Sequence, residues 1–193
     1  MLFASLATFA SLSLLSKGYW NTFRPELKIV DLAIDGERNN PMGELNILHL
    51  TDIHIENLSV SSDKVKKMIK DETFDLIALT GDYVDRLSSI HSFLDFLKGI
   101  MEIPTRFGVY AVWGNHDWLL KKDGLNILKE KMEALGVVVL ENEAKTIFKD
   151  NTPIHLIGID DHYSGHGDVH RAFRHVPGDG LRLILTHDPL VVN

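Results

Sequence analysis

Seven short apolar runs alternate with amphipathic segments along this chain, and this alternation constrains the fold more than any other feature. Each run is four to eight residues long, which is typical of buried strands. The segments between them carry apolar residues three and four positions apart, the spacing of one helix face. Strand, helix and strand in succession predict an α/β protein with crossover helices. The expected strands are 27–34, 45–50, 76–80, 109–113, 137–140, 154–159 and 181–186.

The composition is that of an ordinary globular domain. Hydrophobic residues make up 45% of the 193 and charged residues 24%, which excludes whole-chain disorder, collagen and coiled coils. Lysine and arginine number 20 against 27 aspartates and glutamates, a formal charge of -7. That balance argues against a broad basic surface, so nucleic acid is not an expected partner. The chain has no cysteine, which excludes disulfides, thiolate metal ligands and cysteine nucleophiles.

Residues 1–25 differ from the rest and are expected to form a short membrane anchor. Met1–Ser16 is apolar and uncharged, but it is shorter than the roughly 20 apolar residues of a bilayer span. Two interpretations therefore stay open, an anchor clipped at its start or a buried core helix. The residues that follow favour the anchor, because basic and aromatic side chains flank membrane spans at the interface. These residues are Lys17, Tyr19, Trp20 and Arg24.

Four of the expected strands run into residues that bind metals or move protons. The runs through Leu50, Thr80, Trp113 and Leu185 continue as TDIH, GDYVDR, GNHD and THDP. Ligands bind beyond the carboxyl ends of strands in α/β sheets, so these side chains are expected at one edge. That edge would carry Asp52, His54, Asp82, Asn115, His116 and His187.

The donors at this edge form a mixed set of carboxylates, imidazoles and an amide. Such a set suits Mn, Fe, Zn or Mg rather than a soft metal. It holds more donors than one ion uses, which indicates two divalent ions roughly 3.5–4 Å apart that share a carboxylate. Each motif alone has a structural alternative: Asp82 could lie in a turn, Asn115 with Asp117 could cap a helix, and His187 could be a core histidine. All four motifs in order, each closing an apolar run, favour the metal site.

Taken together, the four blocks between Asp52 and Pro189 resemble the signature of the calcineurin-like metallophosphoesterase superfamily. The sequence around them, as in ILHLTDIH and GVYAVWGNHD, is similar to that of a bacterial branch of membrane-associated phosphoesterases. That branch resembles UDP-2,3-diacylglucosamine hydrolases of lipid A biosynthesis. The resemblance implies an αββα sandwich of mixed sheets with flanking helices over residues 26–193. It also implies a protein at the bacterial inner membrane, and the basic residues after the anchor favour the cytoplasmic side.

The resemblance implies the substrate class and the metal ligands as well. The expected reaction is hydrolysis of a phosphomonoester, phosphodiester or pyrophosphate bond, with a lipid-linked nucleotide as one candidate substrate. A nucleotide phosphodiesterase or nuclease shares the motifs and stays an alternative. Asp52 and His54 would hold the first metal, Asp82 would bridge both, and Asn115 and His187 would hold the second.

Three further residues receive catalytic roles from the same resemblance. His116 would be the general acid, and Asp85 would orient it and keep it protonated, because a nearby carboxylate raises the pKa of an imidazole. Arg86 would contact a phosphate oxygen through its planar fork, or pair with an acidic neighbour. A metal-bridging hydroxide would attack in line, so no covalent intermediate is expected.

One block of the family signature, Gly-His-x-His, is absent before the chain ends at Asn193. In the family it gives one ligand to each metal, and the order and spacing of Gly165–His170 do not match it. The resemblance therefore predicts a domain incomplete at its carboxyl terminus, with an unpaired sheet edge and weak metal binding. The chain would be a piece of a longer enzyme, or a non-catalytic scaffold that keeps the fold.

The remaining polar residues receive structural interpretations. His49 is expected in the core or bonded to a partner, and Asp123 is expected to cap the helix that contains Leu125. Asp160 and Asp161 are expected in a turn, with the orientation of a histidine as the alternative. The other histidines are expected on the surface or in loops: His91, His155, His162, His170 and His175.

Overall fold

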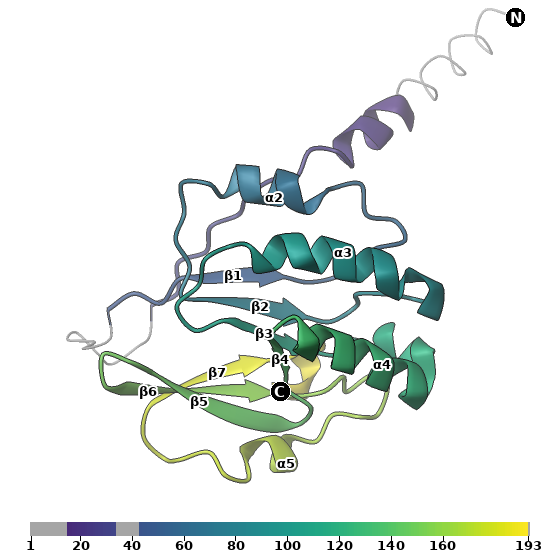
Figure 1. Cartoon of the computed structure of the whole chain (residues 1–193). Helices are drawn as coiled ribbons and strands as arrows, with labels where there is room; N and C mark the ends of the chain where they lie inside the picture. Colours follow the sequence, from purple (N-terminus) through teal and green to yellow (C-terminus); the bar gives the residue numbers. More distant parts are fainter. Residues whose placement is uncertain (1–14, 34–42, 193) are drawn as a thin grey trace, which may run out of the picture.

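The computed structural model describes residues 15–33 and 43–192, and Figure 1 shows two sheets between outer helices. The first half contains β1 (Ile47–Leu50), α2 (Ser62–Met68), β2 (Leu76–Thr80), α3 (Ile90–Met101), β3 (Val109–Val112), α4 (Lys121–Ala134) and β4 (Val137–Val139). The second half contains β5 (Glu143–Lys149), β6 (Thr152–Gly158), α5 (Val169–Phe173) and β7 (Leu181–Leu185). Three short 3-10 helices complete the fold: η1 (Leu87–Ser89), η2 (Asp117–Leu120) and η3 (Pro189–Val192).

The first sheet is parallel, with its strands in the sequential order β1-β2-β3-β4. Strands β2, β3 and β4 are apolar on both faces, because successive side chains point to opposite sides and both sides are covered, whereas β1 carries the exposed His49. In β2, Ile77 and Leu79 belong to the core shared with the helices, whereas Leu76 and Ala78 belong to the core shared with the second sheet. Helices α2, α3 and α4 cover the first of these faces (Figure 1).

The second sheet has the order β5-β6-β7, and β7 lies at one edge. Strands β5 and β6 pair antiparallel and β6 and β7 pair parallel, so the sheet is mixed. Ile154 and Leu156 of β6 face the first sheet, whereas Ile157 packs with Ala172 of α5 on the outer side. The layers are therefore helix, sheet, sheet and helix, as the family resemblance implied.

Three local predictions are wrong. Residues 27–33 form no strand, and Ile29 and Leu32 are 68% and 86% exposed; strand propensity alone does not hold a segment that has no hydrogen-bonded neighbour. Strand β5 was not expected, because most of its side chains are exposed and polar. Helix α4 has Leu120 at its N-cap position, so Asp123 lies inside the first turn.

The amino-terminal anchor lies mostly outside the described residues. Residues 1–14 and the turn-rich segment 34–42 are not described, whereas residues 15–21 are helical. Within residues 15–33 and 43–192, no helix combines the length and the apolar character that a bilayer crossing requires.

Candidate metal centre

Four loops, one after each of β1, β2, β3 and β7, bring the candidate donors together. The loop after β7 belongs to the second sheet, and a hydrogen bond ties it to the first: His187 Nδ1 donates to the Thr80 carbonyl oxygen at 2.8 Å. The loops after β1 and β2 continue the parallel pairing of their strands, because the His54 N–H donates to the Asp82 carbonyl at 2.9 Å. The four motifs therefore lie together because three of them follow neighbouring parallel strands and the fourth is hydrogen-bonded to the loop after β2.

Asp82 is the centre of this arrangement. Its side chain is only 4% exposed, and its Oδ2 atom lies 3.4 Å from the Nε2 atoms of both His54 and His187. Its Oδ1 atom accepts the His116 backbone N–H at 2.9 Å. One carboxylate oxygen is therefore fixed by the backbone, while the other faces two imidazole nitrogens. Ligand atoms of Asp52, His54 and Asp82 all lie within 4.8 Å of one another.

Hydrogen bonds to the far side of each ring determine which imidazole nitrogen can bind a metal. A carbonyl oxygen can only accept, so His187 Nδ1 carries the hydrogen and Nε2 keeps its lone pair. His54 Nδ1 faces Asp85 Oδ1 at 3.2 Å, which favours the same tautomer. Metal-binding histidines commonly bond a carbonyl or carboxylate in this way. The donor chemistry therefore fits a divalent cation next to Asp82.

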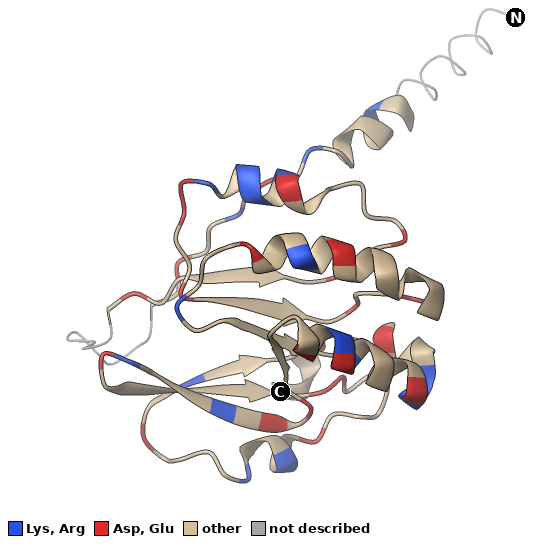
Figure 2. Ribbon diagram, in the orientation of Figure 1, with Lys and Arg blue, Asp and Glu red and all other residues tan. Residues whose placement is uncertain are grey.

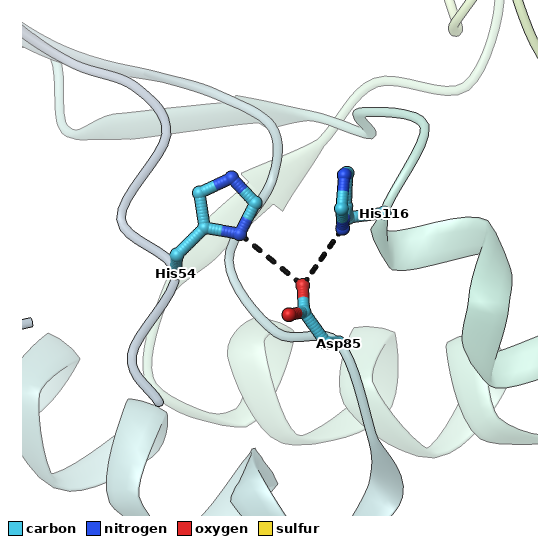
Figure 3. Close-up of side chains that lie close together, drawn as sticks. All are labelled: His54, Asp85 and His116. Atoms are coloured by element: carbon cyan, nitrogen blue, oxygen red, sulfur yellow. Dashed lines mark hydrogen bonds and ion pairs between the residues drawn. The ribbon is translucent and has the colours of Figure 1, made fainter. Parts of the chain in front are cut away.

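Asp85 joins His54 to His116 (Figure 3). Its Oδ1 atom lies 2.9 Å from His116 Nδ1 and 3.2 Å from His54 Nδ1, and the two rings meet edge to face with centroids 4.7 Å apart. Partial burial opposes ionisation of Asp85, but the hydrogen bonds from His54 and His116 outweigh it and lower the pKa of its carboxyl. The structure thus places Asp85 against His116, and it adds a contact with His54 that the sequence did not predict.

Three donor residues have left-handed backbone conformations. The φ angles of Asp52, His54 and Asp82 are 50°, 37° and 56°, a region that non-glycine residues seldom adopt. Such conformations cost on the order of 1–3 kcal/mol each and persist where surrounding structure fixes them. The strained turns aim side chains from the ends of β1 and β2 at the common centre.

Asp117 holds the backbone of two of these loops. Its fully buried carboxylate accepts N–H groups from Asp82 and Tyr83 at 2.8 Å and from Gly114 at 2.9 Å. Burial raises the pKa of Asp117 to about 7, although these backbone N–H groups favour its charged form. From the sequence, Asp117 was interpreted only as a possible helix cap. Its place in the GNHD block was the one sequence feature that could have indicated a role at the site.

Glycine is required where the loops after β2 and β3 meet. A Cβ atom on Gly114 would lie 2.2 Å from Asp82 Oδ1, and one on Gly81 would lie 2.4 Å from the Gly114 nitrogen. Both distances are well below van der Waals contact, so neither position has room for a side chain. This close backbone approach lets Asp82 sit beside the loop that carries Asn115 and His116.

Comparison with known proteins assigns this constellation to a family. Residues 45–191, which include all the donors, match the model of the calcineurin-like phosphoesterases. The chain belongs to this family. Its members are metal-dependent phosphoester hydrolases, so the resemblance seen in the sequence is confirmed at that level. Neither the UDP-2,3-diacylglucosamine hydrolase-like branch nor the membrane anchor receives support from the match.

Two relatives show how much of this chain and of each relative the sequence similarity covers. The chain is 36% identical over 189 residues to the uncharacterized metallophosphoesterase YkoQ of Bacillus subtilis, covering 97% of this chain and 69% of YkoQ. It is 32% identical over 149 residues to the phosphodiesterase YaeI of Escherichia coli, covering 74% of this chain and 52% of YaeI. The chain thus spans about two thirds and about half of their lengths. The phosphopantetheinyl hydrolase PptH of Mycobacterium tuberculosis aligns at 19% identity with a TM-score of 0.41, over 61% of this chain and 43% of PptH.

Two predicted site residues are less closely tied to this calcineurin-like centre. Asn115 lies half-buried between Gly114 and His116, and within the described residues its amide makes no hydrogen bond to the other donors. Arg86 has a side chain that is 67% exposed, with Nε 3.9 Å from Glu56 Oε1 and 3.4 Å from the Ser89 hydroxyl. The structure therefore places Arg86 against an acidic neighbour, the alternative that the sequence left open.

A second polar cluster supports the loop that carries His116. Trp118 donates its indole N–H to Asp160 Oδ1 at 3.0 Å, and its ring stacks on His166 with centroids 3.3 Å apart. Burial raises the pKa of Asp160 to about 6, and the Trp118 hydrogen bond only partly offsets it. Asp160 thus bonds a tryptophan rather than a histidine. The sequence gave no signal for this contact, which joins segments 42 residues apart.

Proposed function

We propose that this protein hydrolyses a phosphoester bond with two divalent cations, one held by Asp52, His54 and Asp82 and the other by Asp82, Asn115 and His187. The observation that carries the proposal is the geometry at Asp82 Oδ2, where Nε2 atoms of histidines from two different sheets both lie at 3.4 Å. Two imidazoles with hydrogens on Nδ1 turn their lone pairs toward one carboxylate oxygen. Two cations that share one carboxylate ligand would make use of this oxygen.

The residues around the donors have separate tasks in this reaction. When bound, the cations neutralise phosphoryl oxygens and lower the pKa of water. His116 keeps one ring nitrogen free, because Asp85 occupies the other at 2.9 Å. Asp85 holds that ring in place, so the other ring nitrogen of His116 can give a proton to the leaving oxygen. Asp117 and the two glycines fix the backbone on which these groups stand.

The proposed substrate is a lipid-linked phosphoester, and the proposed location is the cytoplasmic face of a bacterial inner membrane. Support comes from the amino-terminal side, where the exposed rings of Tyr19 and Trp20 stand next to Lys17 and Arg24. Amphipathic rings and cations are typical of a membrane interface. A substrate related to UDP-2,3-diacylglucosamine would suit both the membrane location and the phosphoesterase reaction, because it carries acyl chains and a pyrophosphate.

Manganese titration tests the metal site first. The melting temperature of the chain should rise with added Mn²⁺, because a ligand that binds only the folded state stabilises it. Asp82→Asn keeps the size of the side chain but removes the charge, so the rise should disappear. Asp71→Asn is the matched control, since Asp71 is 84% exposed on the surface. An equal rise in the three proteins would refute the assignment of Asp82.

Hydrolysis of bis-p-nitrophenyl phosphate tests the reaction. The rate should depend on Mn²⁺ and fall at least about 100-fold in His116→Asn, within the range expected for loss of a general acid. Metal binding by the His116→Asn protein, measured through the same melting shift, should stay near that of the parent. Lost metal binding in this variant would make His116 a ligand instead. Metal binding without any hydrolysis would favour the non-catalytic scaffold.

A further inference from the structure

The segment 82–85 carries two carboxylates of the site, and it has neither helix nor strand structure. The four strands of the first sheet contain no aspartate, glutamate, lysine or arginine, and Figure 2 shows them without either colour. Asp52, Asp82 and Asp85 therefore all stand on loops beyond the strand ends. A loop keeps its conformation only if other groups bind its backbone. The partners of this backbone determine where the two carboxylates of the segment point.

Two carboxylates from neighbouring segments bind the four successive N–H groups of 82–85. Asp117 accepts the first three, those of residues 82, 83 and 84. The fourth, the N–H of Asp85, donates instead to Glu56 Oε1 at 3.0 Å. Asp117 thus fixes the part of the segment that carries Asp82, and Glu56 fixes the part that carries Asp85.

Glu56 lies in the loop after β1, and this loop contacts the segment from the other side as well. Its neighbour Ile55 donates its N–H to the Tyr83 carbonyl at 3.1 Å. The Glu56 side chain is only 5% exposed, and its Oε2 atom is buried without a hydrogen-bond partner among the described residues. A buried oxygen without a partner costs free energy. Stabilisation of the fold is therefore not sufficient to explain a glutamate at this position.

The contact between Asp85 and His116 connects this anchoring to the proposed reaction. Asp85 Oδ1 lies 2.9 Å from His116 Nδ1, as a dashed line in Figure 3 shows. The backbone of His116 is fixed separately, because its N–H donates to Asp82 Oδ1 at 2.9 Å. A displaced Asp85 would therefore let the imidazole turn about its side-chain bonds while the loop stays in place.

We propose that Glu56 is a positioning residue for proton transfer. Through the Asp85 N–H it holds Asp85 where that carboxylate orients the His116 ring toward the leaving oxygen. Glu56 acts through Asp85 and not on the ring itself. This inference rests on the proposed phosphoesterase function, and it adds a residue that lies outside the four motif blocks.

Three substitutions at Glu56 test whether the position of the acceptor oxygen matters. Glu56→Gln keeps an oxygen within reach of the Asp85 N–H. Glu56→Asp keeps the charge but withdraws the oxygens by one methylene, and Glu56→Met keeps the length without an acceptor. Glu72→Met is the matched control, because Glu72 is exposed. Melting curves establish that each variant is folded, and the shift with Mn²⁺ should stay near that of the parent, because Asp117 holds Asp82.

The rates of two diesters distinguish a positioning role from a general loss of structure. Bis-p-nitrophenyl phosphate releases p-nitrophenolate, which needs less help from an acid than the phenolate of diphenyl phosphate. With saturating Mn²⁺, Glu56→Met and Glu56→Asp should lower kcat for diphenyl phosphate roughly 10-fold, a part of what a general acid contributes. They should lower kcat for bis-p-nitrophenyl phosphate by a smaller factor, and Glu56→Gln should stay near the parent with both.

The ratio of the two kcat values does not depend on the amount of active protein. An equal loss with both diesters would therefore indicate a merely structural role and overturn the proposal, as would no loss at all. A loss in Glu56→Gln as large as that in Glu56→Met would also overturn it, because the acceptor oxygen would then not be the cause.

Nuclear magnetic resonance of the His116 ring separates this inference from the function on which it rests. The signals of this ring, identified as those missing in His116→Asn, should move in Glu56→Met and Glu56→Asp and stay in Glu56→Gln. A parent that hydrolyses neither diester, with signals that move in this way, would support the positioning and remove the proposed reaction. Hydrolysis by the parent, with signals unmoved in all three variants, would leave the reaction and overturn the role of Glu56.

Discussion

Replacing Asp160 with asparagine should stabilise the folded protein at neutral and alkaline pH. Asp160 is 4% exposed, and its Oδ1 atom accepts hydrogen bonds from Trp118 Nε1 at 3.0 Å and from the Asp161 N–H at 2.8 Å. An asparagine has the same shape and offers the same acceptor oxygen. The substitution therefore removes the buried charge and keeps both hydrogen bonds.

The pKa of Asp160 gives the size of the effect. It rises from an ordinary value of 3.8 to about 6 in the folded state, which corresponds to about 3 kcal/mol. Below pH 3.8 the carboxyl is neutral in both states and costs nothing. As pH rises, the unfolded chain ionises first, and the folded state loses stability until the pH passes about 6. Of this loss, about 1.4 kcal/mol falls between pH 5 and pH 8.

Urea unfolding at pH 5 and pH 8 measures this difference. The free energy of unfolding of Asp160→Asn, relative to that of the parent, should increase by about 1.4 kcal/mol from the lower to the higher pH. The raised pKa of Asp117 acts in both proteins and cancels. Trp118→Phe removes one donor to Asp160, so it should steepen the pH dependence of the parent. A relative stability of Asp160→Asn that does not change with pH would refute the reasoning.

Other substitutions test the loops and the core. Gly114→Ala would place a Cβ atom 2.2 Å from Asp82 Oδ1 and should abolish the Mn²⁺-dependent melting shift, whereas Gly178→Ala, with open space around it, should change nothing. Asp117→Asn turns an amide group toward backbone N–H donors and should lower the free energy of unfolding by about 2–4 kcal/mol in urea titrations; a loss below 1 kcal/mol would contradict its anchoring role. Leu128→Ala empties a fully buried position of α4 and should cost about 2–5 kcal/mol in the same titrations, without a change in Mn²⁺ binding.

The buried strands could be predicted because both faces of the first sheet are covered. β2 and β3 read as continuous apolar runs for that reason, and their ends were correct within one residue. Strand β5 could not be found in this way, because it is stabilised by pairing with β6 rather than by burial. The expectation that His155 lies at the surface was wrong. It is 1% exposed, and its Nδ1 atom bonds the hydroxyl of Thr146 in β5 at 2.8 Å.

The candidate donors could be predicted because motif order and strand order coincide. The carboxyl ends of parallel strands lie at one edge of a sheet, so the sequence alone predicted that Asp52, Asp82 and Asn115 lie near each other. The sharing of Asp85 between two histidines could not be predicted, because it depends on the angles at which two loops leave the sheet. The roles of these residues in metal binding and catalysis stay predictions until the experiments above are done.

The positive φ angles at Asp52, His54 and Asp82 have a consequence for mutagenesis. Alanine at any of the three would remove a ligand atom and would also disfavour the local turn, so its effect would mix two causes. Asparagine and glycine adopt left-handed conformations more readily than alanine. A saturation library selected only for folding should therefore enrich asparagine, aspartate and glycine at these codons, even when no metal is present.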